Sequence, residues 1–307
     1  MATYQTAKTQ YITTHDNAIK FAYRQFGTPS ISGVPLLFLI HFRGTMDKWD
    51  PLLINSTAQH REVILVDYAG LGQSTGRVAT SFRESAADIA TFLSLIGVKK
   101  VDVLGFSIGA LVGQLLALNH STTSDQEKSL HVRKLIIAGS SSSIGPDMPE
   151  TTNDYKTAAT AATLTVQEFK ELFFPRNAAG EKAAEEWWAR VSERNESTSG
   201  EVPSDWGSQG FKDGGAAIQA QAGAYGKILD VEGSKGLEGT YDRLGELKMP
   251  VLVAQGSDDF MFPTINSFHL QQKVPNGQLI VYPNSGHGFL YQYAETFAKH
   301  VGIFLDA

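Results

Sequence analysis

Six short runs of apolar residues recur along the chain, and each has the unbroken character of a strand that is buried on both faces. They lie at 34–40, 62–67, 101–106, 134–139, 250–256 and 277–283. A different pattern precedes them, because residues 11–27 alternate apolar and polar positions around Asp16 and Asn17. That alternation predicts a β-hairpin at one edge of a sheet.

Helical periodicity fills most of the intervals between these runs. Residues 82–97 have apolar side chains at helical spacing and end on a glycine, which is a common helix C-cap. The other helical segments are 108–120, 265–274 and 293–306. Strands that alternate with helices predict an α/β fold, with a mostly parallel sheet covered by helices on both faces.

The alternation stops between about residues 144 and 244, where β-branched runs are almost absent. Polar, glycine-rich joints connect three helix-like stretches there, at 166–174, 178–195 and 214–229. We therefore expect a helical cap, or lid, inserted at 144–244. The core domain is then formed by residues 1–143 together with 245–307.

Composition narrows the class of protein. The chain has 307 residues, of which 42% are hydrophobic and 19% charged, as in an ordinary soluble globular protein. The net charge of −6, without a basic stripe, argues against a nucleic-acid partner. No apolar run reaches the roughly 18 residues of a membrane span, and the first residues lack a signal-peptide pattern. We expect a cytoplasmic protein with no membrane partner.

The absence of cysteine excludes disulfides, thiolate metal ligands and a cysteine nucleophile. The eight histidines are scattered and show no metal-ligand spacing. We therefore expect neither a metal nor another cofactor, and a metalloenzyme is the least favoured class.

Residues 105–109 read Gly-Phe-Ser-Ile-Gly, which matches G-x-S-x-G between a buried strand and a helix. This setting is typical of a nucleophile elbow, in which the serine hydroxyl stands clear of a strained turn. Side chains larger than glycine would collide with the turn two residues on either side of Ser107. The alternative is an ordinary glycine-rich joint between a strand and a helix.

A serine nucleophile needs a base with a pKa near neutrality, and the base needs a carboxylate to orient it. His287 lies between two glycines just after the last apolar run, and Asp258 and Asp259 follow the run before it. The chain order Ser, Asp, His is the order of α/β hydrolases. The alternative is that these residues have only structural roles, the histidine as a loop residue and the aspartates as caps of turns.

An oxyanion needs two preorganised N–H donors. One is expected from Ile108, the residue after the serine, and the other from Phe42 or Arg43 in the loop after the first apolar run. His41 in that loop reads better as a structural residue than as a catalytic one.

Together these motifs resemble the α/β-hydrolase superfamily of esterases, lactonases and cofactor-free haloperoxidase-like enzymes over nearly the whole chain. Residues 67–74 (DYAGLGQS) are similar to its D-x-x-G-x-G-x-S loop, and residues 256–263 (GSDDFMFP) to its G-x-x-D-x-x-x-P segment. The resemblance places the acid on Asp259. It implies the α/β-hydrolase fold, with a mostly parallel sheet of the eight-stranded type and an inserted helical lid.

One departure concerns the oxyanion loop, where the family usually has His-Gly followed by an apolar residue. This chain has Gly44 displaced to the end of His-Phe-Arg-Gly. We prefer Phe42 as the second donor, with Arg43 as the second choice. Arg43 also has two other readings, as a ligand for a substrate carboxylate or as an ion-pair partner of Asp47.

The predicted activity is that of a serine esterase or lactonase acting through a Ser107–Asp259–His287 catalytic triad and an acyl-enzyme. Serine at the elbow argues against dehalogenase and epoxide-hydrolase chemistry, for which the superfamily uses aspartate. Several lid aromatics suggest an enclosed apolar pocket and a small hydrophobic ester or lactone. They are Phe169, Phe173, Phe174, Trp187, Trp188, Trp206 and Phe211.

For contact with the substrate we nominate His41, Arg43, Phe260 and Trp187. Two alternatives stay open: a perhydrolase or acyltransferase that uses the same triad, and a small-molecule-binding protein that does not hydrolyse its ligand. The sequence also leaves the oligomeric state open, a homodimer included.

Overall fold

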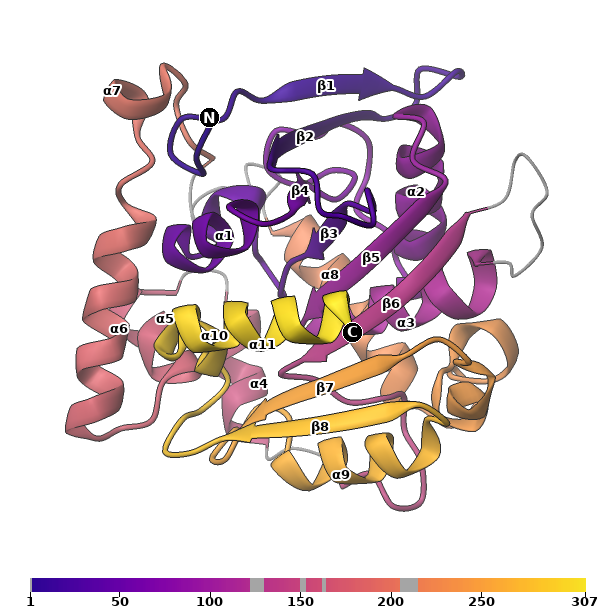
Figure 1. The fold of residues 1–307 in the computed structure, drawn as a ribbon. Helices are drawn as coiled ribbons and strands as arrows, with labels where there is room; N and C mark the ends of the chain where they lie inside the picture. The colour runs from indigo at the N-terminus through magenta and orange to yellow at the C-terminus, as the bar shows by residue number, and fades with distance from the viewer. Residues whose placement is uncertain (1, 122–129, 150–152, 162–163, 205–214) are drawn as a thin grey trace.

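The computed structural model describes residues 2–121, 130–149, 153–161, 164–204 and 215–307. An eight-stranded sheet with the order β1-β2-β4-β3-β5-β6-β7-β8 crosses the molecule (Figure 1). The strands are β1 (Gln10–Thr13), β2 (Lys20–Gly27), β3 (Leu36–Leu39), β4 (Glu62–Val66), β5 (Lys100–Phe106), β6 (His131–Ala138), β7 (Val251–Gly256) and β8 (Gly277–Tyr282).

The pairing of these strands confirms a mostly parallel sheet. Along the sheet from β4 through β3 to β8, every pair of neighbouring strands is parallel, whereas β2 pairs antiparallel with both β1 and β4. The predicted hairpin is β1 and β2, and Asn17 in its turn has φ 60°. β3 is buried along its whole length because helices cover both faces of the sheet, which explains its unbroken apolar sequence.

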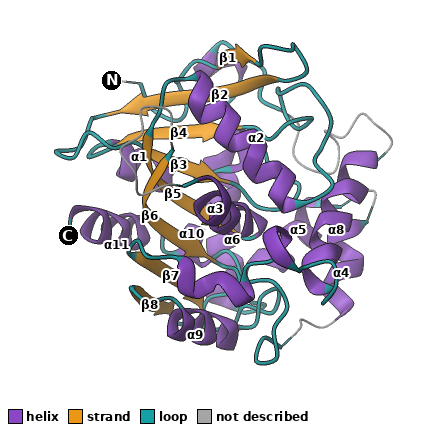
Figure 2. Cartoon of the chain, turned by 90° about the vertical axis from the view of Figure 1, so that its right-hand side faces the viewer, coloured by secondary structure: helices purple, strands orange, loops and turns teal. Residues whose placement is uncertain are grey.

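Helices lie on both faces of the sheet. α1 (Pro51–Ala58) and α11 (Ala294–Asp306) cover one face, and α2 (Phe82–Leu95), α3 (Ile108–His120) and α9 (Thr264–Lys273) cover the other (Figures 1 and 2). The short α10 (Phe289–Gln292) precedes α11. No helix in the described ranges is both long and apolar enough to cross a membrane.

α1 is an element that the sequence analysis did not predict. Asp50 caps it by accepting a hydrogen bond from the N–H of Leu52, and Pro51 occupies the first turn. An acidic residue followed by proline is a known helix-start signal. The sequence carries this signal at residues 50 and 51.

Between β6 and β7 the described residues form helices and no strand. These helices are α4 (Asn153–Thr160), α5 (Val166–Phe173), α6 (Ala178–Val191), α7 (Glu196–Ser199), α8 (Ala216–Leu229), and the 3₁₀ helices η2 (Gly236–Glu238) and η3 (Tyr241–Glu246). α4, α5 and α8 gather on one side of the molecule (Figure 2). The division into core and cap stays a prediction, and Trp206 and Phe211 lie outside the described residues.

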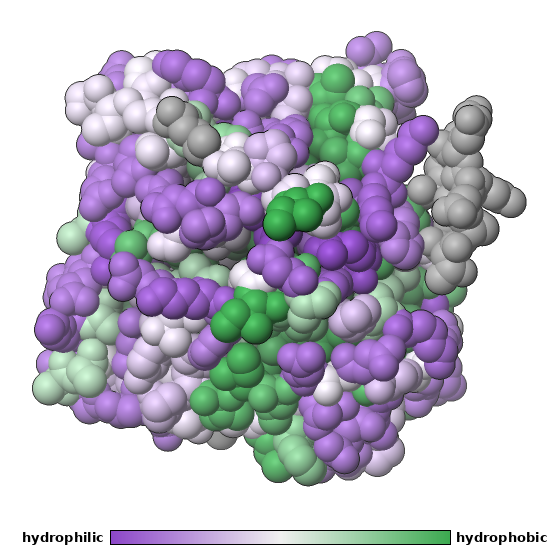
Figure 3. Space-filling model, viewed as in Figure 1, coloured by the Kyte–Doolittle hydropathy of each residue, from purple (hydrophilic) through white to green (hydrophobic). Residues whose placement is uncertain are grey.

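β8 is the edge strand at the end of the sheet opposite β1. Its apolar side chains are only partly covered, and Val281 is 44% exposed. Figure 3 shows apolar side chains gathered over the lower half of this face, where Figure 1 places β8. The oligomeric state stays an open prediction.

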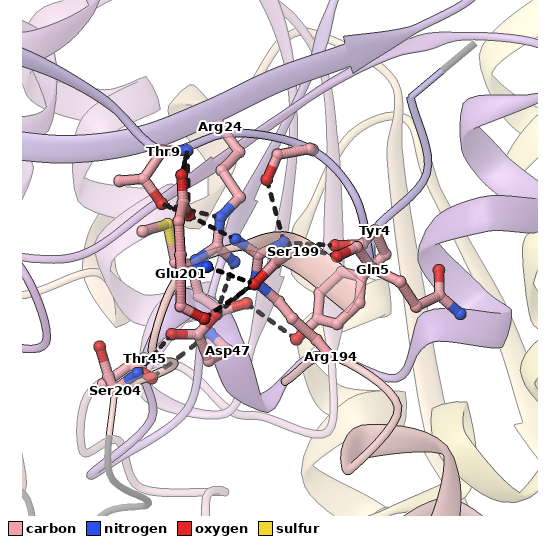
Figure 4. A network of polar contacts seen from close by, with 12 residues as sticks. Tyr4, Gln5, Thr9, Arg24, Thr45, Asp47, Arg194, Ser199, Glu201 and Ser204 are labelled. Atoms are coloured by element: carbon pink, nitrogen blue, oxygen red, sulfur yellow. Dashed lines mark hydrogen bonds and ion pairs between the residues drawn. The ribbon is translucent and has the colours of Figure 1, made fainter. Parts of the chain in front are cut away.

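A buried ionic network ties the residues after α6 to the first half of the chain (Figure 4). Asp47 Oδ1 lies 2.6 Å from Arg24 Nη1 on β2 and 3.2 Å from Arg194 Nε after α6. Arg194 also pairs with Glu201 and donates to the carbonyl of Tyr4. Burial alone would raise the pKa of Asp47, but Arg24 holds that pKa below its ordinary value.

We expect Asp47→Asn to lower the free energy of unfolding by about 3–5 kcal/mol, because it leaves two buried arginines without their shared counter-charge. Urea denaturation measures the loss. Glu186→Gln is the matched control, since Glu186 forms an exposed ion pair with Lys182. The control should cost no more than about 0.5 kcal/mol. Equal effects of the two substitutions would contradict a stabilising role for the network.

Candidate active site

Ser107 lies at the corner between β5 and α3, in a backbone conformation with φ 59° and ψ −126°. The backbone of a residue other than glycine is strained when φ lies in this region. A Cβ atom on Gly105 would overlap the backbone of Ala110, and one on Gly109 would overlap the carbonyl of Leu39. The G-x-S-x-G pattern is therefore a steric requirement of this turn.

The strained serine is held through its backbone by the last residue of β6 and by Ser140, two residues beyond the end of that strand. The N–H of Ser107 donates to the carbonyl of Ala138 (2.9 Å), and the hydroxyl of Ser140 donates to the carbonyl of Ser107 (2.8 Å). The sequence analysis did not single out Ser140. The available signal was its place two residues after the strand that pairs with β5.

Asp259 and His287 form a fully buried pair. His287 Nδ1 lies 2.8 Å from Asp259 Oδ2. The same carboxylate accepts hydrogen bonds from the N–H groups of Met261 and Phe262 and from Gln255 Nε2. A carboxylate held by four donors has a defined orientation. Because an ionised carboxylate only accepts, we assign the proton of the neutral imidazole to Nδ1, which leaves the Nε2 lone pair free.

Asp258, the other acid that the sequence allowed, points elsewhere. It is exposed, and its carboxylate accepts a hydrogen bond from the hydroxyl of Ser257 (2.6 Å). The structure thus brings Asp259, and not Asp258, to His287.

Phe106, the residue before Ser107, and Gly139, which follows the neighbouring strand β6, both lie close to His287. The ring of Phe106 lies 4.8 Å from the imidazole, and a Cβ on Gly139 would lie 3.4 Å from His287 Nδ1. His287 Nε2 is buried, and no group in the described ranges forms a hydrogen bond with it. Ser107 is therefore not bonded to the imidazole here. In unliganded enzymes such catalytic contacts often form only with substrate.

Ser107 opens onto an apolar cavity of about 230 Å³. Its lining residues come from the oxyanion loop, the elbow, α4, α8 and the loop after Asp259. They are Phe42, Ser107, Ile108, Lys156, Ala159, Thr160, Ala222, Tyr225, Gly226, Leu229, Met261 and Phe262. The sequence analysis did not identify the α4 and α8 walls, because no local pattern marks which cap residues face the serine.

The two predicted oxyanion donors, Phe42 and Ile108, share this cavity with Ser107. Within the described ranges the N–H groups of Phe42 and Ile108 make no hydrogen bond to the protein. The N–H of Arg43, the second choice, instead donates to Gln221 Oε1 at 3.0 Å. The geometry therefore favours Phe42 over Arg43.

His41 and Arg43, both proposed as substrate contacts, are buried and do not line the cavity. His41 Nδ1 lies 2.8 Å from the carbonyl of Phe42. Burial lowers the pKa of His41 to about 3, so its imidazole is neutral at physiological pH. Arg43 donates to the carbonyls of Ala159 and Ala161, whereas Asp47 pairs with other arginines. Arg43 thus holds separate protein segments together, whereas His41 bonds within its own loop.

Phe260 and Trp187, the other proposed contacts, also lie away from the cavity lining. Phe260 is 42% exposed. Trp187 is fully buried and stacks on Tyr291 and Phe169, with ring centroids 5.1 and 5.6 Å away. Trp187 thus packs between α5 and α10, and it is not among the residues that line the cavity. Among the described residues, no group of three His, Asp or Glu side chains is placed to bind a metal ion.

Comparisons with known proteins agree with this architecture. Residues 34–292 match a family model described as alpha/beta hydrolase fold. The chain is 31% identical to an alpha/beta hydrolase fold protein from Chitinophaga pinensis, with a TM-score of 0.79 and 100% of each chain covered.

Among curated proteins, the chain is 25% identical over 290 residues to the putative carbamate hydrolase RutD of Caulobacter sp. (strain K31). That match covers 91% of this chain and 93% of the relative. A protein of the same name from Azorhizobium caulinodans is 36% identical over 88 residues, but the match spans only 28% of this chain and 33% of that protein.

Proposed function

The chain belongs to the alpha/beta hydrolase fold family, and we propose that it is a serine hydrolase that cleaves carboxylic esters or lactones of small hydrophobic substrates. One observation carries the proposal. His287 is hydrogen-bonded through Nδ1 to the carboxylate of Asp259. Its Nε2 is buried and has no hydrogen-bond partner in the described ranges, and it lies near the strained turn at Ser107. This is the arrangement that a general base for a serine hydroxyl requires.

In the proposed mechanism His287 Nε2 takes the proton of Ser107 Oγ as that oxygen attacks the substrate carbonyl. The N–H groups of Ile108 and Phe42 bind the oxyanion that develops. His287 then protonates the leaving alcohol, which leaves an acyl-enzyme. Water activated by the same imidazole hydrolyses the acyl-enzyme, and Asp259 stabilises the imidazolium in both steps.

The cavity supports the substrate class. Its lining is mostly aliphatic and aromatic, and its volume of about 230 Å³ suits a small acyl or alcohol group. The name of the relative that spans most of this chain adds carbamates to the compounds to be tested. Attack on a carbamate carbonyl uses the same nucleophile, base and oxyanion donors.

Labelling with a fluorophosphonate, followed by peptide mass spectrometry, tests the proposal. We expect one adduct per chain, on the peptide that contains Ser107, and turnover of at least one short-chain ester, lactone or carbamate. Heat-denatured protein is the control and should not react. Failure of the folded protein to form the adduct, together with saturable ligand binding without turnover, would replace the proposal with that of a binding protein.

Product analysis distinguishes the remaining chemistry at the same site. Added peroxide or alcohol competes with water for the acyl-enzyme. A peracid or a transesterified product that exceeds the free acid would indicate a perhydrolase or an acyltransferase.

A further inference from the structure

Arg43 is a buried cation in the loop that carries Phe42. Its backbone is left-handed, with φ 63°, and burial lowers the pKa of its guanidinium. Its Nη1 donates to the carbonyls of Ala159 (2.8 Å) and Ala161 (2.7 Å), and its backbone N–H donates to Gln221 Oε1 (3.0 Å). One residue therefore bonds to two cap segments.

These two segments are walls of the cavity. Ala159 lines the cavity from α4, and Ala222, next to Gln221, lines it from α8. Phe42, the neighbour of Arg43, lines it from the core side with its N–H unbonded within the described ranges. Arg43 thus joins the cap walls and the oxyanion donor through consecutive bonds.

We propose that Arg43 is a positioning residue whose hydrogen bonds hold α4 and α8 against the oxyanion loop. This set of bonds, the Arg43 clasp, fixes the walls of the cavity and the position of the Phe42 N–H together. The inference rests on the proposed function. It assigns Arg43 a role different from contact with a substrate carboxylate.

The chemistry of arginine suits this role. The carbonyls at a helix C-terminus lack intrahelical partners and carry partial negative charge, so a guanidinium there is favourable. The two N–H groups of the planar Nη1 have fixed directions and donate to the two carbonyls, whereas a lysine ammonium acts as a point charge without that fixed geometry. A buried guanidinium needs such acceptors, since an unsatisfied charge in the interior is costly.

The test compares Arg43→Met with Arg43→Lys and with Arg243→Met. Arg243 is the matched control because its Nη2 also donates to a carbonyl near the end of a helix, that of Leu118 in α3, far along α3 from Ser107. We expect kcat per active site, titrated with the phosphonate, to fall about 10–100-fold in Arg43→Met, with a smaller change in KM. Arg43→Lys should recover part of the loss, and Arg243→Met should leave kcat unchanged.

Hydrogen exchange supplies a readout that does not depend on activity. Amides of α4 and α8 should exchange faster in Arg43→Met than in wild type, but not in Arg243→Met. If Arg43→Met does not fold, Gln221→Met removes one arm of the clasp and should show faster exchange in α8 with reduced kcat. Arg43 and Gln221 variants that match Arg243→Met in both measurements would overturn the inference. A wild-type protein without phosphonate labelling would instead overturn the proposed function, while the exchange result still tests the clasp.

Discussion

We expect Ser107→Ala to lower kcat for ester hydrolysis by about 10⁴-fold or more, because the variant has no nucleophile to form the acyl-enzyme. The residual activity is expected to come from direct attack by water on a substrate that the cavity and the oxyanion donors still bind. Steady-state kinetics on the best substrate of the panel measures the loss. Retention of full activity by Ser107→Ala would show that the chemistry occurs elsewhere.

Ser107→Gly is the matched variant for this experiment. It also lacks the hydroxyl and should be equally inactive. Glycine tolerates φ 59°, whereas alanine does not, so Ser107→Gly should be the more stable of the two by about 1 kcal/mol. Thermal unfolding makes the comparison. Inactivity in both variants, together with this order of stability, separates loss of the nucleophile from loss of the fold.

We expect Asp259→Asn to lower kcat by an amount of similar order, about 10⁴-fold, for a different reason. The asparagine carbonyl oxygen can still accept hydrogen bonds from the N–H groups of Met261 and Phe262, so the loop should keep its shape. Its amide NH₂ then faces His287 Nδ1 and favours the tautomer with the proton on Nε2. That imidazole cannot remove a proton from Ser107.

Asp258→Asn is the control, since this neighbouring acid is exposed and bonds to Ser257. We expect its kcat to stay within about twofold of wild type, in keeping with the small effects of most surface substitutions. The kinetics of both variants are compared on the same ester, with circular dichroism as a check of folding. A large loss in Asp258→Asn and none in Asp259→Asn would reverse the assignment of the acid.

The sequence alone determined the features that depend on local sterics and periodicity. Unbroken apolar runs predicted the six parallel strands. The reason holds for the strands covered on both faces, such as β3 and β7, which have no solvent side on which polar residues are stable. The edge strand β8 is an exception, because it is apolar but partly exposed. Gly105 and Gly109 predicted the elbow, because any Cβ there would overlap the backbone. His287 was proposed from its loop position after the last strand, and this position places its ring beside Phe106.

Only the tertiary structure decided which neighbouring side chain points where. The resemblance had placed the acid on Asp259, but the direction of each carboxylate depends on the fold, because the turn after β7 brings Asp259, and not Asp258, to His287. The sequence analysis proposed Trp187 and Phe260 as pocket residues, but Trp187 is buried against Tyr291 of α10 and Phe260 is exposed.

Arg43 illustrates the same limit. The acceptors of its side chain and backbone lie more than 100 residues away along the chain. Periodicity reports whether a position is buried, whereas the partner of a buried polar group depends on how distant segments pack. For that reason the sequence was sufficient to propose the nucleophile, but the cavity walls and the clasp required the folded chain.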